Sequence, residues 1–79
     1  MTTGDFSYVN TSGDDYTLRN PCSGKYLELV GGALRVVNRT NTRAILCKER
    51  GSRGSRLVIY PGASGSFGGA AVPDLVIFD

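Results

Sequence analysis

Three arginines at three-residue spacing are the side chains of this sequence best suited to chemistry. Arg50, Arg53 and Arg56 lie in or directly after the segment 49–55, which is rich in glycine and serine. A guanidinium group is planar and always charged, and it can donate two hydrogen bonds to one phosphate or carboxylate. The spacing therefore indicates a loop that could bind an anionic group.

This basic region has three interpretations. From Arg35 to Arg56 there are seven basic residues and one acidic residue, whereas all charged side chains in residues 1–15 are acidic. A basic loop can bind nucleic acid, but such sites usually interleave aromatic side chains with the charges, and this loop has none before Tyr60. It can instead meet an acidic segment of a neighbouring subunit. Alternatively, the charges only keep a glycine-rich surface soluble and its edge strands unpaired. We expect the second role.

Catalytic residues are hard to find. The sequence has no histidine, which is the commonest general base and zinc ligand. Asp14 and Asp15 are adjacent carboxylates, but neighbours on a strand point in different directions, so the pair indicates a turn. No nucleophile elbow or phosphate-binding glycine loop occurs. We therefore expect no enzyme activity, no metal and no cofactor.

Two cysteines, Cys22 and Cys47, leave two alternatives open. A disulfide between them would close a loop and add roughly 3 to 4 kcal/mol of stability in the chain-entropy model. Otherwise both are free thiols that pack as small apolar groups, as is usual in cytoplasmic proteins.

The compartment is not fixed by the sequence. Met1 is followed by Thr2, Thr3, Gly4 and Asp5, without the basic and apolar segments of a signal peptide. No apolar run approaches the ~20 residues of a membrane span. We expect a soluble protein without a membrane partner, made in the cytoplasm or carried in a virus particle, although a mature secreted domain would look the same.

The elements that must position these residues are short strands. Runs of Val, Ile, Leu, Tyr and Phe alternate with turn clusters, which predicts an all-β fold. We expect a small antiparallel β-sandwich or partly open barrel of about six or seven strands over 15–79, with residues 1–14 as a flexible N-terminal arm. A chain this short has a marginal core, so support from a neighbour is expected.

A hairpin over 25–38 is the clearest predicted unit. Gly31 and Gly32 suit a two-residue turn, because glycine reaches positive φ without a steric clash. The resulting register places Leu29 opposite Leu34 and Glu28 opposite Arg35. Tyr26 then lies on the other face with Val30 and Val37, a face that a second sheet or another subunit must cover.

Three further units complete the prediction. Residues 43–48 and 56–60 form a second hairpin, and a turn at Tyr60, Pro61 and Gly62 precedes a short strand over 64–67. Residues 75–78 are four consecutive apolar residues, so we expect this segment to be buried on both faces. It lies either in the centre of its own sheet or against a neighbouring subunit.

We therefore expect a non-enzymatic structural or interaction subunit. Small size, β content and free arms are typical of accessory or decoration proteins of virus and phage particles. The expected partners are other protein subunits, either copies of the chain or a larger shell, rather than nucleic acid or a small molecule. The alternative is a small secreted inhibitor or toxin, stapled by the disulfide. The residues expected to contact a partner are Arg50, Arg53, Arg56, Tyr26, Phe6, Tyr8 and Phe78.

Overall fold

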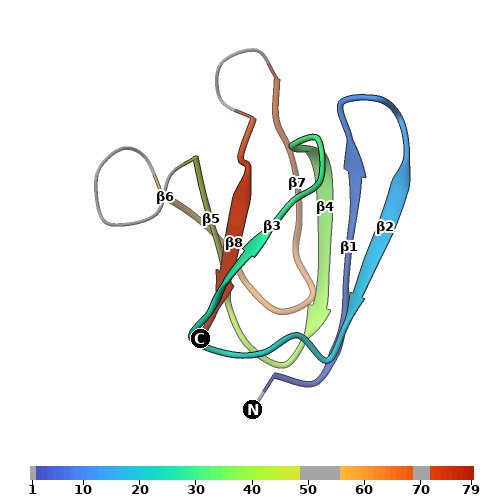
Figure 1. Cartoon of the computed structure of the whole chain (residues 1–79). Helices are drawn as coiled ribbons and strands as arrows, with labels where there is room; N and C mark the ends of the chain where they lie inside the picture. The colour runs from blue at the N-terminus through green and yellow to red at the C-terminus, as the bar shows by residue number, and fades with distance from the viewer. Residues whose placement is uncertain (1, 49–55, 69–71) are drawn as a thin grey trace.

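Two antiparallel sheets packed face to face make up the structure, a computed structural model that describes residues 2–48, 56–68 and 72–79 (Figure 1). The all-β sandwich is confirmed, with eight strands in these residues rather than six or seven. No described helix is long and apolar enough to span a membrane. The strands are β1 (Gly4–Asn10), β2 (Asp15–Arg19), β3 (Tyr26–Glu28), β4 (Ala33–Thr40), β5 (Ala44–Cys47), β6 (Arg56–Ile59), β7 (Ser64–Ser66) and β8 (Leu75–Phe78).

Each sheet has four strands. Sheet A has the order β2-β1-β4-β7, and sheet B has the order β3-β8-β5-β6. The predicted N-terminal arm is wrong, because β1 lies inside sheet A, paired with both β2 and β4. Its alternating pattern explains this position: Phe6 and Tyr8 point inward and are buried, so the strand supplies the core instead of extending from it.

The core lies between the sheets and is centred on aromatic and aliphatic side chains. Phe6 of sheet A and Phe78 of sheet B meet edge to face, with ring centroids 5.3 Å apart and an interplanar angle of 83°. Such contacts add about 0.5–1.5 kcal/mol to the burial of the rings. The remaining buried members of the core are Tyr8, Leu29, Ala33, Val36, Ala44, Leu46, Ile59 and Val76.

The predicted hairpin over 25–38 does not form. β3 pairs with β8 in sheet B and β4 pairs with β1 and β7 in sheet A, so the chain changes sheets at Gly31 and Gly32. The turn itself exists, since Gly32 N–H donates to the Leu29 carbonyl. Its two ends, however, bond to the chain before β8, with Leu29 N–H donating to the Asp74 carbonyl and Ala33 N–H to the Pro73 carbonyl. These long-range hydrogen bonds displace the predicted pairs of Leu29 with Leu34 and of Glu28 with Arg35.

The other predicted strands are confirmed. β5 and β6 are antiparallel partners, with Ala44 opposite Ile59. The turn after β6 closes by a hydrogen bond from Ala63 N–H to the Tyr60 carbonyl, with Gly62 at a φ of 84°. β8 lies in the centre of sheet B, between β3 and β5, as four consecutive apolar residues suggested.

A buried asparagine fixes the passage from sheet A to sheet B. Asn38 is fully buried, and its amide nitrogen donates to the carbonyls of Ile59 and Thr42 at 2.8 and 2.9 Å. Its side-chain oxygen accepts from the backbone N–H of Thr40 at 3.0 Å and from the Thr40 hydroxyl. The side chain therefore ties β4, β6 and the β4–β5 connection together in the interior, where its partner Thr40 is also buried.

The substitution Asn38→Ala tests this role. It leaves the Ile59 carbonyl and the Thr40 N–H without their side-chain partner, whereas the Thr42 carbonyl still accepts from the Thr40 hydroxyl. We therefore expect the free energy of unfolding to fall by roughly 3 kcal/mol in urea titrations. Thr11→Ala is the matched control, because the hydrogen bond that the Thr11 hydroxyl donates to the Gly31 carbonyl is exposed and water can replace it. Its expected loss is below about 1 kcal/mol. Equal losses for both variants would contradict the role given to Asn38.

Candidate protein-binding face

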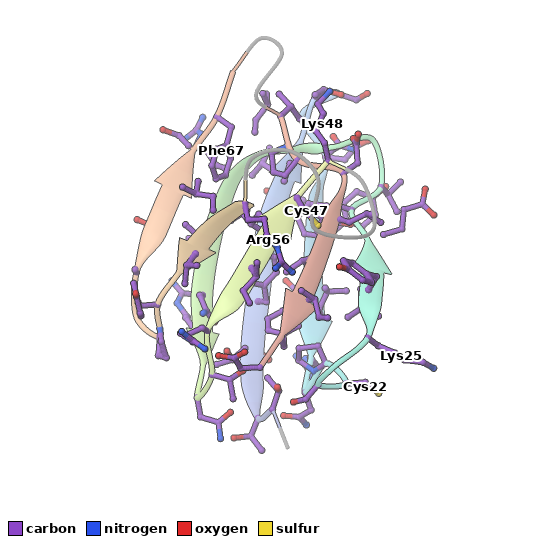
Figure 2. All side chains as sticks on the ribbon, turned by 90° about the vertical axis from the view of Figure 1, so that its left-hand side faces the viewer. Cys22, Lys25, Cys47, Lys48, Arg56 and Phe67 are labelled. Carbon is purple, nitrogen blue, oxygen red and sulfur yellow. The ribbon has the colours of Figure 1, made fainter. Side chains whose placement is uncertain are left out.

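The outer face of sheet B is built by alternation along its four strands. Val76 and Phe78 of β8 point into the core, so Leu75 and Ile77 point outward. Side chains directly opposite one another share a face, and the register therefore assigns the outward residues of the neighbouring strands. Figure 2 looks onto this face.

The outward residues form three rows across the strands β3, β8, β5 and β6. The central row is entirely apolar or aromatic, and each member is partly buried. The first row has charged ends around an apolar middle, in which Cys47 is only 3% exposed, and the third is polar. The first row is Glu28, Leu75, Cys47 and Arg56, the central row is Tyr26, Ile77, Ile45 and Val58, and the third row is Asp79, Arg43 and Tyr60.

The outer face of sheet A has a different character. One of its rows places Asp5 between Arg19 and Arg39, and another carries Asp15 and Arg35 at separate strands. A shallow, open hollow lined in part by Asp15, Arg35 and Arg39 would bury little of a small ligand. The basic region of the sequence is thus divided, because Arg35 and Arg39 lie on this face whereas Arg43 and Arg56 lie on the opposite one. The described bases of the segment 35–56 therefore do not form a single patch.

The charges around the apolar row of sheet B are separated by sign. The acid Glu28 lies in β3 and the acid Asp79 directly after β8, whereas the base Arg43 lies directly before β5 and the base Arg56 in β6. Arg43 and Asp79 form an ion pair where the two halves meet. The hydrogen bond and the charge of Asp79 raise the pKa of the Arg43 guanidinium. Within the three outward rows, the acids therefore lie on the β3–β8 half and the bases on the β5–β6 half, while Lys25, directly before β3, lies outside these rows.

The candidate disulfide is absent, since Cys22 and Cys47 are both free. Cys47 lies opposite Leu75, whereas Ser23, the neighbour of Cys22, bridges to Phe78 at the other end of β8. The two positions are roughly 10 Å apart along β8, and they lie on opposite sides of it. A disulfide needs Cα atoms within about 7 Å, so the fold keeps the thiols apart. Figure 2 shows the two cysteines at different ends of the sheet.

Burial and a neighbouring charge act on the Cys47 thiol in opposite directions. Burial raises its pKa, and the positive charge of Arg56, directly opposite on β6, lowers it by less, so the net pKa is raised. The thiol is therefore a poorer nucleophile than an exposed cysteine at neutral pH. Figure 2 shows Arg56 beside Cys47.

The residues expected to contact a partner are divided among three places. Tyr26 and Arg56 lie on the outer face of sheet B. Phe6, Tyr8 and Phe78 are core residues, at most 3% exposed, so their assignment to a partner surface is wrong. Their inward positions in regular strands explain this. Arg50 and Arg53 lie outside the described residues.

The sequence reasoning missed most of this face. Ile45, Val58 and Ile77 each occupy an outward strand position next to an inward apolar residue, so simple alternation would have marked them as surplus to one core. The signal was present in the run 75–78. The sequence does not reveal which strands pair with one another, and the outward rows follow only from that pairing. Within the described residues, no group of three acids or cysteines could hold a metal ion.

The position of Arg56 beside Cys47 can be tested through the thiol. In a Cys22→Ser background, Arg56→Gln removes the charge that lowers the Cys47 pKa, so we expect alkylation of Cys47 to shift to higher pH. The measurement is the pH dependence of the alkylation rate. Lys48→Gln is the matched control and leaves the profile unchanged, because the charge that acts on the Cys47 thiol is that of Arg56. If Arg56→Gln and Lys48→Gln shifted the pH profile of alkylation equally, Arg56 would not lie next to the Cys47 thiol.

Comparison with known proteins does not assign the chain to a family. Neither the models of protein families, nor the curated protein sequences, nor the solved structures contain a significant match to the chain. The assignment of function therefore depends on the chemistry of the two outer faces described above.

Proposed function

We propose that the protein is a non-enzymatic structural subunit, which joins neighbouring protein subunits through the outer face of sheet B. The single observation that carries this proposal is the central row of that face. Tyr26, Ile77, Ile45 and Val58 cross all four strands without a polar interruption. A sheet face of an isolated sandwich normally alternates apolar inward with polar outward residues.

The contrast between the two outer faces strengthens the proposal. Sheet A directs Asp5, Arg19 and Arg39 to solvent, which is the expected composition for a surface that remains in water. Sheet B directs aliphatic side chains outward from its central strands, with charges only around them. A dry centre inside a polar rim is the usual arrangement of protein–protein interfaces.

The kind of assembly is the second part of the proposal. An accessory or decoration protein of a virus or phage particle is the class that fits best, because a domain of 79 residues has a small core and is stabilised by attachment to neighbours. The alternative of a secreted inhibitor loses its main support, since Cys22 and Cys47 are not bridged. Nucleic-acid binding gains no support from the described bases, because Arg35 and Arg39 lie on the other sheet from Arg56, while Arg50 and Arg53 lie outside the described residues.

Sedimentation tests the proposal. The tagged chain is added to extract of the cells in which it is naturally made, and the extract is centrifuged through a sucrose cushion. We expect the wild-type chain to sediment with large protein assemblies and Ile77→Lys to remain in the supernatant, because a buried ammonium group in the contact is costly. Val37→Lys is the matched control, an outward valine of sheet A, and should sediment like the wild type.

Two results would contradict the proposal. If all three proteins stay in the supernatant, the chain does not join a large assembly. If all three sediment equally, the outer face of sheet B is not the contact. Circular dichroism confirms that each variant is folded, which is expected because both substitutions replace outward side chains and leave the core intact.

A further inference from the structure

We infer that the subunit docked on the outer face of sheet B is a second copy of this chain, related by a two-fold axis parallel to the strands. The inference rests on the proposed function and names its partner. Its basis is the separation of charge on the face: the acids Glu28 and Asp79 lie on the β3–β8 half and the bases Arg43 and Arg56 on the β5–β6 half. A surface of this kind is complementary to itself after the correct rotation.

The correct rotation follows from the strand order. An axis that lies in the interface, midway between β8 and β5, turns the second copy over so that its β3 lies above β6 and its β8 above β5. The acidic half of each copy then covers the basic half of the other. An axis perpendicular to the strands would instead place acidic half on acidic half, which is unfavourable. The charges therefore select one of the two face-to-face arrangements.

The same rotation keeps each row in register with itself. Glu28 and Arg56 are the two ends of the first row, so each Glu28 faces an Arg56 of the second copy. Asp79 and Arg43 belong to the third row and form a four-charge cluster with their equivalents near the axis. The apolar central rows lie on one another between these charges. Facing sheets pack about 10 Å apart, a distance that side chains of this size fill.

Within one copy, Glu28 and Arg56 are too far apart to form an ion pair with each other. They lie on the two outermost strands of sheet B, three strand spacings or roughly 14 Å apart. Both side chains are exposed. The pairing is therefore available only between copies, which makes these residues suitable for a test that leaves the fold intact.

The size of the face sets the strength of the dimer. Stable interfaces bury about 800 Å² on each partner, and three rows on four short strands provide a smaller contact. We therefore expect a reversible dimer whose population rises with protein concentration. In that dimer the edge strands of both sheets, β2, β7, β3 and β6, remain at the outside, so the pair can still contact other subunits of an assembly.

Charge reversal tests the arrangement by sedimentation-velocity ultracentrifugation across a concentration series. Wild-type protein is expected to form dimers, and Glu28→Arg or Arg56→Glu alone to weaken self-association on the order of tenfold, because each brings like charges together at both ends of the interface. An equimolar mixture of the two variants restores the dimer, since every reversed residue then faces its opposite. Asp15→Arg, which reverses an exposed acid on the outer face of sheet A, is the control and leaves self-association unchanged.

Each other outcome overturns the inference. A wild-type chain that stays monomeric at every concentration excludes the second copy as partner. Dimers that resist both single reversals, or single reversals that the mixture does not rescue, exclude this two-fold arrangement. The proposed function fails separately, because it is decided by whether Ile77→Lys releases the chain from large assemblies while Val37→Lys does not.

Discussion

Val76 and Phe78 must face the core, and this requirement on β8 decides what the sandwich presents to its surroundings. Phe78 meets Phe6 of the opposite sheet edge to face, and Val76 is completely buried. Because side chains alternate along a strand, Leu75 and Ile77 have no inward position left. β8 is also the strand that carries β3 and β5 on either side, so its orientation sets the outward residues of both neighbours.

The two outer faces follow from this constraint but differ in composition. On sheet A the outward positions are occupied mainly by charged residues and by serine and threonine, which water solvates well. On sheet B they are occupied by Ile45, Ile77 and Val58, with acids and bases separated around them. The Arg43–Asp79 ion pair marks the line where the two signs meet. A single small core thus supports one face suited to water and one suited to another protein surface.

The sequence predicted the strands well and their pairing less well. The strand over Asp15–Arg19, the β5–β6 pair and the turn at Pro61 depend on local signals, and all three are present. Gly31 and Gly32 also form a turn, but a glycine pair does not reveal whether the following strand returns to the same sheet. That choice is made by hydrogen bonds from Leu29 and Ala33 to residues 73–74, which lie 45 and 40 positions further along the chain.

The prediction of the partner-contact residues was partly wrong for a related reason. Phe6, Tyr8 and Phe78 are aromatic and near the chain ends, which suggested sticky termini, whereas strand pairing directs all three inward. Tyr26 and Arg56 were placed on a contact surface, and both lie on the outer face of sheet B. The charge separation on that face could not be foreseen, because it appears only when Glu28 and Asp79 are brought to one half of the sheet by the order β3-β8-β5-β6.

The most direct measurement of the central claim is a dilution series followed by amide chemical shifts in two-dimensional NMR spectra. If the outer face of sheet B is the docking surface, the amides of Ile45, Val58 and Ile77 shift with protein concentration, and those of Ser7, Val37 and Ser64 on sheet A do not. Shifts confined to sheet A, or spectra that do not depend on concentration, would contradict the assignment of a second copy to that face.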